Sequence, residues 1–159
     1  MTAFNAAVVS VSDTRQAETD VSGDRLAALI GSIGAAVTHR QMATDDREPL
    51  AGVLAELCGR DDIDVIFTTG GTGLGPRDNT PEATLAVIER EAPGLAEAMR
   101  QTTAAITPTA ILSRGVCGIR GRTLIVNLPG SPKAVEECFA AIEPVLGHAL
   151  RQIAGVADH

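Results

Sequence analysis

The chain of 159 residues has no tryptophan and no tyrosine, and its only phenylalanines are Phe4, Phe67 and Phe139. Its core must therefore be built from alanine, valine, leucine and isoleucine. A chain of this length buries about 70% of the surface that its unfolded form exposes. We expect a single domain spanning residues 1–159, in which a bound ring system finds few aromatic faces to stack on.

Basic residues are scarce and scattered. The sequence has twelve arginines and one lysine, Lys133, against 20 acidic residues, so its formal net charge is −7 at pH 7. Binding to nucleic acids or to anionic membranes needs a concentrated positive field. Because no basic run exists, we expect neither partner.

Long apolar runs are also missing. No stretch approaches the roughly 20 apolar residues that a membrane-spanning helix needs, and MTAFNAAVVS carries no basic segment before its apolar residues. We therefore expect a cytoplasmic protein. Cys58, Cys117 and Cys138 are odd in number and far apart, which predicts reduced, structural thiols rather than a disulfide framework or a zinc site.

Short apolar runs alternate with helical patterns along the chain. The runs, rich in β-branched residues, predict strands at 6–12, 35–41, 64–70 and 123–130. The segments between and around them predict helices at 22–34, 48–59, 80–94 and 93–106. This alternation predicts an α/β fold with a mostly parallel central sheet. Continuous hydrophobicity in the first and third strands predicts burial on both faces.

Prolines mark the ends of several elements. Thr80-Pro81 and Ser131-Pro132 each combine a hydroxyl N-cap with a proline in the first turn, so both predict helix starts. Pro144 predicts a break or a kink near residue 143 in the last helix. Residues 107–121 predict a short strand plus a loop.

Polar loops follow all four predicted strands. They are SDTR (12–15), ATDDRE (43–48), the glycine-rich TTGGTGLGPRDNTPEAT (68–84) and NLPGSPK (127–133). Ligands of open parallel α/β sheets bind outside the carboxyl ends of the strands, where these loops would meet. The mixture of carboxylates, hydroxyls and a few cations suits a Mg²⁺-nucleotide, since Mg²⁺ takes one or two carboxylates together with phosphate oxygens.

The glycine-rich loop fits neither familiar phosphate-binding motif. It lacks the Gly-Lys-Ser/Thr of a P-loop, and GTGLG is not G-x-G-x-x-G. Phosphate binding and a tight strand-to-helix turn both favour glycine, but the adjacent Arg77-Asp78 pair favours a functional loop. Lys133, at a predicted helix N-terminus, suits an anion, although an ordinary capped turn has the same pattern.

Nucleophilic catalysis has no support, because no Ser-His-Asp or Cys-His order can be assembled around the three histidines. Positioning and electrostatic stabilisation of phosphate groups are the favoured chemistry. The residues alone therefore indicate a phosphate-binding α/β enzyme.

These loops together resemble a known family. SDTR, DVSG (20–23), TTGGTGLGPRDNTPEAT, PGLAEAMR (93–100), AILSRGVCGIRG (110–121) and the segment from TLIVNLPGSPK to the last helix are similar to the molybdopterin adenylyltransferases, which include the bacterial Mog and MoaB proteins, the G domain of gephyrin and the plant adenylyltransferase domain. The resemblance implies a three-layer α/β/α domain, assembled as a homotrimer. It implies Mg²⁺-dependent transfer of AMP from ATP to molybdopterin, with release of pyrophosphate and possible hand-over of the product to a molybdenum insertase.

The resemblance also implies site residues. Asp45 and Asp78 match the catalytic, Mg²⁺-binding aspartates. The nucleotide would contact Gly70, Gly71, Thr72, Gly73 and Lys133. Molybdopterin would contact Ser12, Asp13, Thr14, Asp20, Ser113, Arg114, Asn127, Pro129, Gly130 and Ser131. The family commonly has proline before its first aspartate, whereas this chain has Thr44, so Asp46 remains an alternative to Asp45.

Three other functions remain open at this stage. The first is a MoaB-type protein that binds molybdopterin without adenylylating it. The second is a trimeric scaffold that clusters partners, as the gephyrin domain does. The third is a pyrophosphatase acting on another nucleotide.

Overall fold

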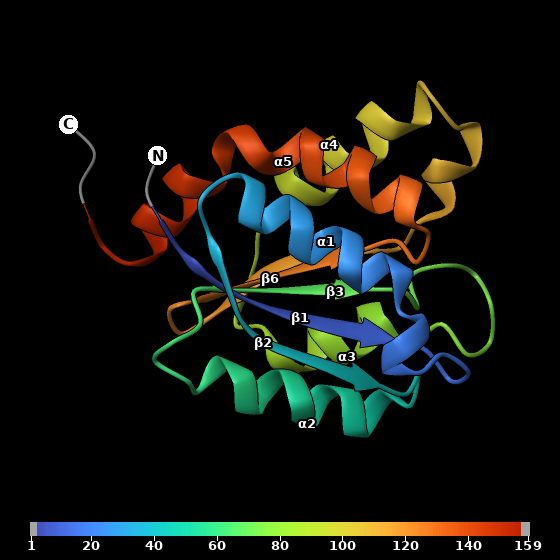
Figure 1. The fold of residues 1–159 in the computed structure, drawn as a ribbon, viewed down its shortest axis with the longest axis horizontal. Helices are drawn as coiled ribbons and strands as arrows, with labels where there is room; N and C mark the ends of the chain where they lie inside the picture. Colours follow the sequence, from blue (N-terminus) through green and yellow to red (C-terminus); the bar gives the residue numbers. More distant parts are fainter. Residues whose placement is uncertain (1–2, 157–159) are drawn as a thin grey trace.

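The computed structural model describes residues 3–156 (Figure 1). The strands are β1 (Asn5–Val11), β2 (Ala36–Ala43), β3 (Val65–Thr69), β4 (Arg90–Glu91), β5 (Cys117–Arg120) and β6 (Thr123–Leu128). The helices are α1 (Val21–Ser32), α2 (Arg47–Cys58), α3 (Thr80–Val87), α4 (Pro93–Ala104) and α5 (Pro132–Ile153), with 3₁₀ turns η1 (Ala17–Thr19) and η2 (Pro108–Leu112).

One six-stranded sheet in the order β2-β1-β3-β6-β5-β4 organises the fold. β2, β1, β3 and β6 are parallel, whereas β5 and β4 are antiparallel additions. The α/β fold with a mostly parallel sheet is therefore confirmed. The chain moves from β1 to one side for β2 and then to the other side for β3, so the topological switch point lies between β1 and β3.

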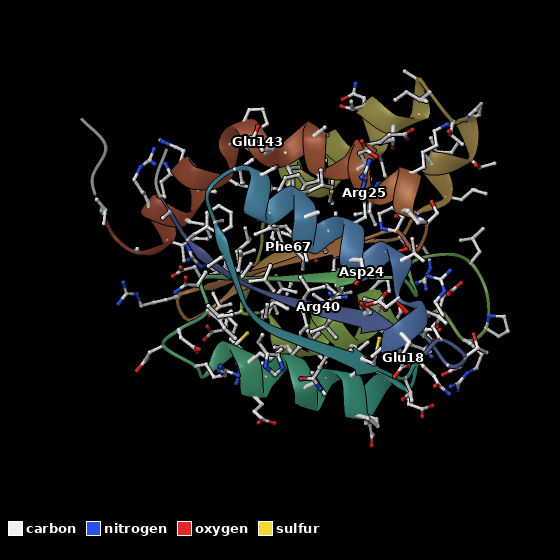
Figure 2. The ribbon with its side chains drawn as sticks, viewed as in Figure 1. Glu18, Asp24, Arg25, Arg40, Phe67 and Glu143 are labelled. Atoms are coloured by element: carbon white, nitrogen blue, oxygen red, sulfur yellow. The ribbon has the colours of Figure 1, made fainter. Side chains whose placement is uncertain are left out.

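Helices cover both faces of the sheet and give three layers. In Figure 1, α1, α4 and α5 lie on one side and α2 and α3 on the other. The larger apolar core lies under α1, α4 and α5 and contains Phe67, which is labelled in Figure 2. The ring centroid of Phe67 lies 5.8 Å from that of Phe139 in the same core. The second core lies under α2 and α3. β1 from Ala6 onward and all of β3 are buried, as their continuous hydrophobicity predicts.

Most element bounds agree with the sequence-based predictions to within two residues. The helix predicted at 80–94 is wrong beyond Val87, because the chain leaves the helix to pair with β5. Glu89 N–H donates to the Ile119 carbonyl and Ala92 N–H to the Cys117 carbonyl, both at 2.8 Å. Residues 107–121 form η2 and β5, in line with the predicted loop and short strand.

The two predicted helix starts differ in outcome. Ser131 is the N-cap of α5 and accepts from Ala134 N–H, as predicted. The N-cap of α3 is Asn79 rather than Thr80. Thr80 is instead the first helical residue, and its hydroxyl donates to the Gly70 carbonyl at 2.9 Å, which ties α3 to the glycine-rich loop.

Of the two outcomes predicted at Pro144, a break or a kink, the break is wrong, because α5 is continuous from Pro132 to Ile153. Pro144 and Ala140, whose carbonyl loses its intrahelical partner, both retain access to solvent, so water can satisfy that carbonyl. Burial of Ile142 and Leu146 holds the two halves of the helix on the sheet. Tertiary packing therefore outweighs the local preference of proline.

The cysteines are free thiols, as predicted. Burial raises the pKa of Cys58 and Cys138 to about 11 and that of Cys117 to about 12. All three thiols are therefore protonated and poor nucleophiles at neutral pH.

Within residues 3–156, no helix combines the length and the apolar character that crossing a membrane requires.

Candidate active site

The carboxyl ends of the parallel strands bring four polar loops to one edge of the sheet. In Figure 1 the arrowheads of β1 and β2 point to this edge. The backbone of the loop after β1 is bonded to the end of β2, since Ser12 N–H donates to the Ala43 carbonyl at 2.9 Å. Gly70 N–H donates to the Leu128 carbonyl at 3.1 Å, which joins the loops after β3 and β6. This edge contains the switch point, where ligands of such sheets bind.

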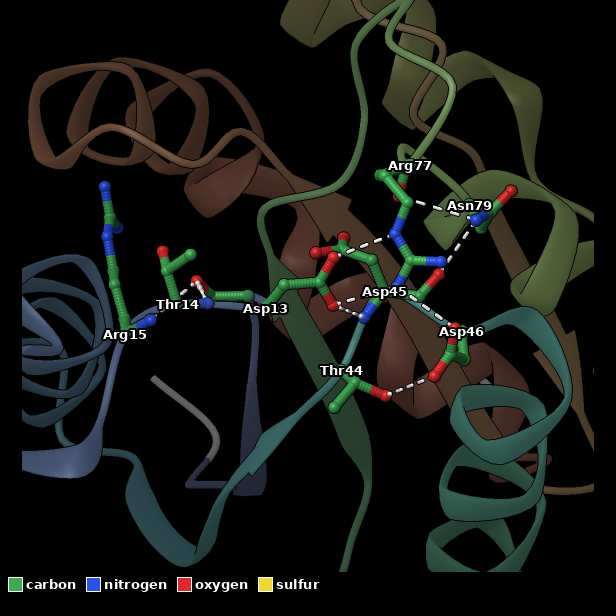
Figure 3. A network of polar contacts seen from close by, with 9 residues as sticks. Asp13, Thr14, Arg15, Thr44, Asp45, Asp46, Arg77 and Asn79 are labelled. Carbon is green, nitrogen blue, oxygen red and sulfur yellow. Dashed lines mark hydrogen bonds and ion pairs between the residues drawn. The ribbon is translucent and has the colours of Figure 1, made fainter.

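Asp45 lies at the centre of a polar network over β1, β2 and β3 (Figure 3). Its backbone N–H donates to Asp13 Oδ1 at 3.0 Å, and its carbonyl accepts from Asn79 Nδ2 at 2.9 Å. Arg77 donates to both carboxylate oxygens of Asp13, at 2.9 and 3.1 Å, and lies 3.0 Å from Asp46 Oδ1. Three loops are thereby joined through side chains.

The carboxylate of Asp45 is buried without the partners that such burial normally requires. Asp45 is 8% exposed, and its Oδ1 is the one buried side-chain oxygen or nitrogen among residues 3–156 without a hydrogen bond. Burial, followed by the charges of Asp13 and Asp78, raises its pKa above the ordinary 3.8. Native structures rarely leave such an atom without a partner, and the usual partners are an ordered water, an ion or a bound ligand. Asp46, by contrast, is exposed and accepts from Thr44 at 3.3 Å.

Asp78 lies within the glycine-rich loop, which folds around its carboxylate. Its Oδ2 accepts from Gly75 N–H at 2.9 Å. A Cβ on either Gly73 or Gly75 would lie 2.9 Å from that oxygen, so glycine lets the loop fold closely around the carboxylate. The influence of Asp78 on the pKa of Asp45 indicates that the two carboxylates lie near each other.

Gly70 and Gly71 shape the start of this loop by adopting positive φ angles of 101° and 71°. A Cβ on Gly71 would lie 2.9 Å from Asp45 Oδ1 and 2.3 Å from Thr80 Oγ1. The unpartnered oxygen of Asp45 therefore faces a surface from which a side chain is excluded. Of the three glycines that the resemblance assigns to the nucleotide, Gly71 is the one that adjoins this oxygen.

Arg114, which follows η2, binds the backbone of the glycine-rich loop. Its guanidinium donates to the carbonyls of Gly73 at 2.8 Å and Asp78 at 2.7 Å, and it forms an ion pair with Glu82 at 2.7 Å. All three guanidinium nitrogens are thus engaged within the protein. This arrangement restricts the loop that carries Asp78 and favours a positioning role for Arg114.

The Glu82–Arg114 pair predicts a specific pH dependence of stability. The hydrogen bond from Arg114 lowers the pKa of Glu82 below its ordinary 4.5. The stabilisation is therefore present above pH 4.5 and is lost as the pH falls through the folded-state pKa. The difference in unfolding free energy between wild type and Glu82→Gln, measured with urea, should shrink as the pH falls below 4.5. A difference that grows in acid would contradict this role.

A pocket of about 410 Å³ adjoins the glycine-rich loop. It lies between the α4–η2 segment and the start of α5, with an apolar floor that includes Met99 and Cys138. Seven of the predicted site residues line it: Thr72, Gly73, Ser113, Asn127, Pro129, Ser131 and Lys133. Lys133 is 77% exposed in its side chain and contacts Glu137 only at 3.9 Å, so its ammonium group is available to a ligand.

Other predicted residues lie outside this pocket. Asp13 and Asp45 belong to the polar network described above. Ser12 accepts from the N–H groups of Thr14 and Arg15, which shapes the loop after β1. Asp20 is buried as the N-cap of α1 and accepts from Ser10 and Arg40, so its oxygens are occupied within the fold.

Asn127 lines the pocket with an amide whose groups are all engaged. Its Nδ2 donates to Thr68 and Thr84 hydroxyls at 3.0 Å, and its Oδ1 accepts from Val116 N–H at 3.1 Å. The side chain thereby connects β6 to β3, α3 and the approach to β5. It shapes the pocket wall without leaving a polar group free for a ligand.

Two arginines of the site are absent from the sequence-based assignment. Arg77 connects the loops after β1, β2 and β3. Arg100 lines the pocket and donates to the carbonyls of Ser113 and Gly115, at 3.3 and 2.8 Å. Both occur inside the motifs PRD and PGLAEAMR, but a motif alone does not reveal which partners a flexible arginine side chain reaches.

The acidic residues fit a magnesium ion held jointly with a substrate. No group of three or more histidine, cysteine, aspartate or glutamate side chains within residues 3–156 is arranged to bind a metal alone. Mg²⁺ commonly binds through one or two carboxylates plus substrate phosphates. The unpartnered Asp45 oxygen and the neighbouring Asp78 carboxylate match that requirement.

Comparisons with known proteins agree with this architecture. The family model described as "Probable molybdopterin binding domain" matches residues 7–148. The molybdopterin adenylyltransferase of Helicobacter pylori J99 is 36% identical over 159 residues, covering 98% of this chain and 90% of the relative. That of Escherichia coli K12 is 38% identical over 154 residues, covering 93% and 78% respectively.

A relative from Drosophila melanogaster, the molybdenum cofactor synthesis protein cinnamon, is 42% identical over 156 residues. These are 96% of this chain but 26% of that protein.

Two solved structures of bacterial proteins are similar to this chain over nearly its whole length. The molybdopterin biosynthesis enzyme MoaB from Thermus thermophilus has a TM-score of 0.88 and 43% identity, covering 96% of this chain and 97% of that one. The Mog protein from Mycobacterium ulcerans has a TM-score of 0.88 and 41% identity, with coverages of 98% and 99%.

Proposed function

Because the chain belongs to the family of probable molybdopterin binding domains, we propose that it is a molybdopterin adenylyltransferase. In this reaction an oxygen of the terminal phosphate of molybdopterin forms a bond to the α-phosphorus of ATP. The bond from that phosphorus to the bridging oxygen of the β-phosphate breaks, and pyrophosphate leaves. The observation that carries the proposal is the unpartnered Asp45 oxygen facing the glycine-rich loop beside Asp78.

Asp45 and Asp78 would hold Mg²⁺, which neutralises the charge that builds up between the two anionic substrates. The attacking phosphate is already anionic, so the reaction needs no strong general base. The main barrier is the repulsion between two phosphate groups, and positioning together with charge neutralisation lowers it. Gly70, Gly71 and Gly73 would let phosphate oxygens approach the backbone closely.

We further propose that the pocket beside α5 binds molybdopterin. The apolar floor at Met99 and Cys138 suits a ring, and the hydroxyls of Ser113 and Ser131 supply polar contacts at its rim. The N-terminus of α5 would attract the terminal phosphate of molybdopterin, and Lys133, at the same helix start, would contact the nucleotide phosphates that meet it. Gly73 lines this pocket and also lies against Asp78, so a phosphate at the pocket edge would be close to the metal site.

The assembly and the hand-over rest on the family resemblance, and the cellular location rests on the missing apolar and basic segments of the sequence. We propose a homotrimer that works in the cytoplasm and passes adenylyl-molybdopterin to a molybdenum insertase. No residue role in the mechanism above depends on this part of the proposal.

Pyrophosphate release tests the activity directly. The wild-type chain should release pyrophosphate from Mg-ATP only when molybdopterin is supplied, and removing Mg²⁺ with EDTA should stop the release because charge neutralisation is lost. Coupled enzymatic detection of pyrophosphate checks this outcome. Release without molybdopterin would instead identify a nucleotide pyrophosphatase. Molybdopterin binding without release would identify a non-catalytic MoaB-type protein.

A further inference from the structure

We propose that Asp13 and Arg77 are positioning residues for Asp45, which they hold so that its unpartnered carboxylate oxygen faces the glycine-rich loop. This inference rests on the proposed function in one respect, namely that Asp45 binds a divalent cation. It assigns Asp13 to the metal site, whereas the sequence motif SDT predicts that Asp13 contacts molybdopterin.

The backbone of Asp45 is held on both sides by side chains from other loops (Figure 3). Asp13, after β1, accepts the Asp45 N–H at 3.0 Å. Asn79, at the start of α3, donates to the Asp45 carbonyl at 2.9 Å. Fixing both peptide groups restricts the direction in which the side chain leaves the backbone. The Asp45 carboxylate is therefore aimed mainly through its own backbone, and the backbone of Asp13 adds a contact to the carboxylate itself.

Arg77 fixes Asp13 in the orientation that this contact needs. Its Nε and one terminal nitrogen donate to the two oxygens of Asp13, at 2.9 and 3.1 Å. The same arginine also pairs with Asp46 at 3.0 Å. The planar guanidinium can make these contacts together, because its donors form a rigid fork. Both oxygens of Asp13 are consequently occupied within the protein.

Arg77 also offsets the repulsion among the neighbouring carboxylates. The negative charges of Asp13 and Asp78 lie close enough to Asp45 to raise its pKa. The positive charge of Arg77 compensates part of this repulsion without a hydrogen bond to the carboxylate of Asp45. A cation can therefore reach Asp45 without first displacing the arginine from it.

The test compares Asp13→Ala, Asp13→Asn and Arg77→Lys with wild type. Asp13→Asn keeps an oxygen that can accept the Asp45 N–H but weakens the contact to Arg77. Arg77→Lys keeps the charge and loses the fork. Asp61→Ala is the control, because Asp61 is exposed, precedes β3 at the other end of the sheet and removes the same charge.

Two measurements are made without turnover. Hydrogen exchange of the Asp45 amide, followed by NMR in the metal-free protein, should accelerate about tenfold in Asp13→Ala, because its acceptor is lost. Mn²⁺ affinity, measured by electron paramagnetic resonance, should fall about 10- to 100-fold in Asp13→Ala. The reason is that Asp45, the proposed metal ligand, loses the hydrogen bond to Asp13 that orients it. Asp13→Asn and Arg77→Lys should weaken Mn²⁺ binding less, and Asp61→Ala should match wild type.

Molybdopterin affinity separates this role from the one that the sequence predicts. It should change less than about twofold in Asp13→Ala, since both oxygens of Asp13 already have protein partners. Unchanged amide exchange and Mn²⁺ affinity, or an equal loss in Asp61→Ala, would overturn the proposal. Absence of pyrophosphate release by wild type, with Mn²⁺ binding still dependent on Asp13, would refute the adenylyltransferase activity and leave the positioning role standing.

Discussion

Asp45→Asn is expected to lower molybdopterin-dependent pyrophosphate release at least about 100-fold while making the metal-free fold more stable. The loss follows because a metal ion supplies several kcal/mol of transition-state stabilisation, and each 1.4 kcal/mol corresponds to about tenfold in rate. The amide that replaces the carboxylate carries no charge to hold the ion. Initial rates of pyrophosphate release at saturating Mg-ATP measure this effect.

The gain in stability has a separate cause. Wild-type Asp45 buries a carboxylate with an unpartnered oxygen, which costs about 1–3 kcal/mol. Removing the charge should recover about 1 kcal/mol and raise Tm by about 2–4 °C. Because burial raises the pKa of Asp45, the cost is absent when the carboxyl is protonated below pH 3.8 and develops as the pH rises through the folded-state pKa. Thermal unfolding in EDTA across this range checks the sign.

Asp46→Asn is the matched comparison for this experiment. Asp46 is exposed and pairs with Arg77, so its replacement should reduce activity much less than that of Asp45. An equal or greater loss would favour Asp46 as the metal ligand, the alternative that Thr44 leaves open. A variant Asp45→Asn that unfolds more readily than wild type would show that the buried charge of Asp45 is not a cost to the fold.

Gly70→Ala is expected to produce the largest loss of stability. Gly70 has a φ of 101°, and a Cβ there would lie 2.4 Å from the backbone oxygen of Val11. Because that oxygen belongs to the central strand β1, it cannot move aside without disturbing the sheet. A positive φ alone costs about 1–2 kcal/mol for a residue with a side chain. With the added clash, we expect a total above about 3 kcal/mol, a large part of the stability of an ordinary domain.

Gly34→Ala separates the two contributions. Gly34 has a φ of 83°, but a Cβ at that position would meet no atom within 4 Å. Its replacement should therefore cost about 1–2 kcal/mol, the conformational part alone. Urea unfolding of both variants and wild type gives the comparison. Equal losses in the two variants would mean that the contact with Val11 does not restrict residue 70.

Local sequence patterns were sufficient to predict most of the fold. Runs such as AAVVSVS and DVIFTTG predict buried strands because a short, continuous apolar run is a property of adjacent residues. The predicted break at Pro144 and the predicted helix at 88–92 failed where distant contacts compete with local preference. α5 continues because its apolar face is buried, and the chain after Val87 leaves its helix to pair with β5.

The sequence by itself determined the α/β fold, the sheet edge that carries the site and the residue types gathered there. Polar loops after parallel strands must meet at one edge, whatever the details of packing. Only the tertiary structure decided which of these residues contact one another. Arg77 and Asp13 are 64 positions apart, and Asp13 and Asp45 are 32 positions apart. No local periodicity encodes such pairs, because their distances depend on how the strands are ordered and how each loop turns. The exposed Asp46 and the buried, unpartnered Asp45 are adjacent in the chain, and only folding distinguishes them.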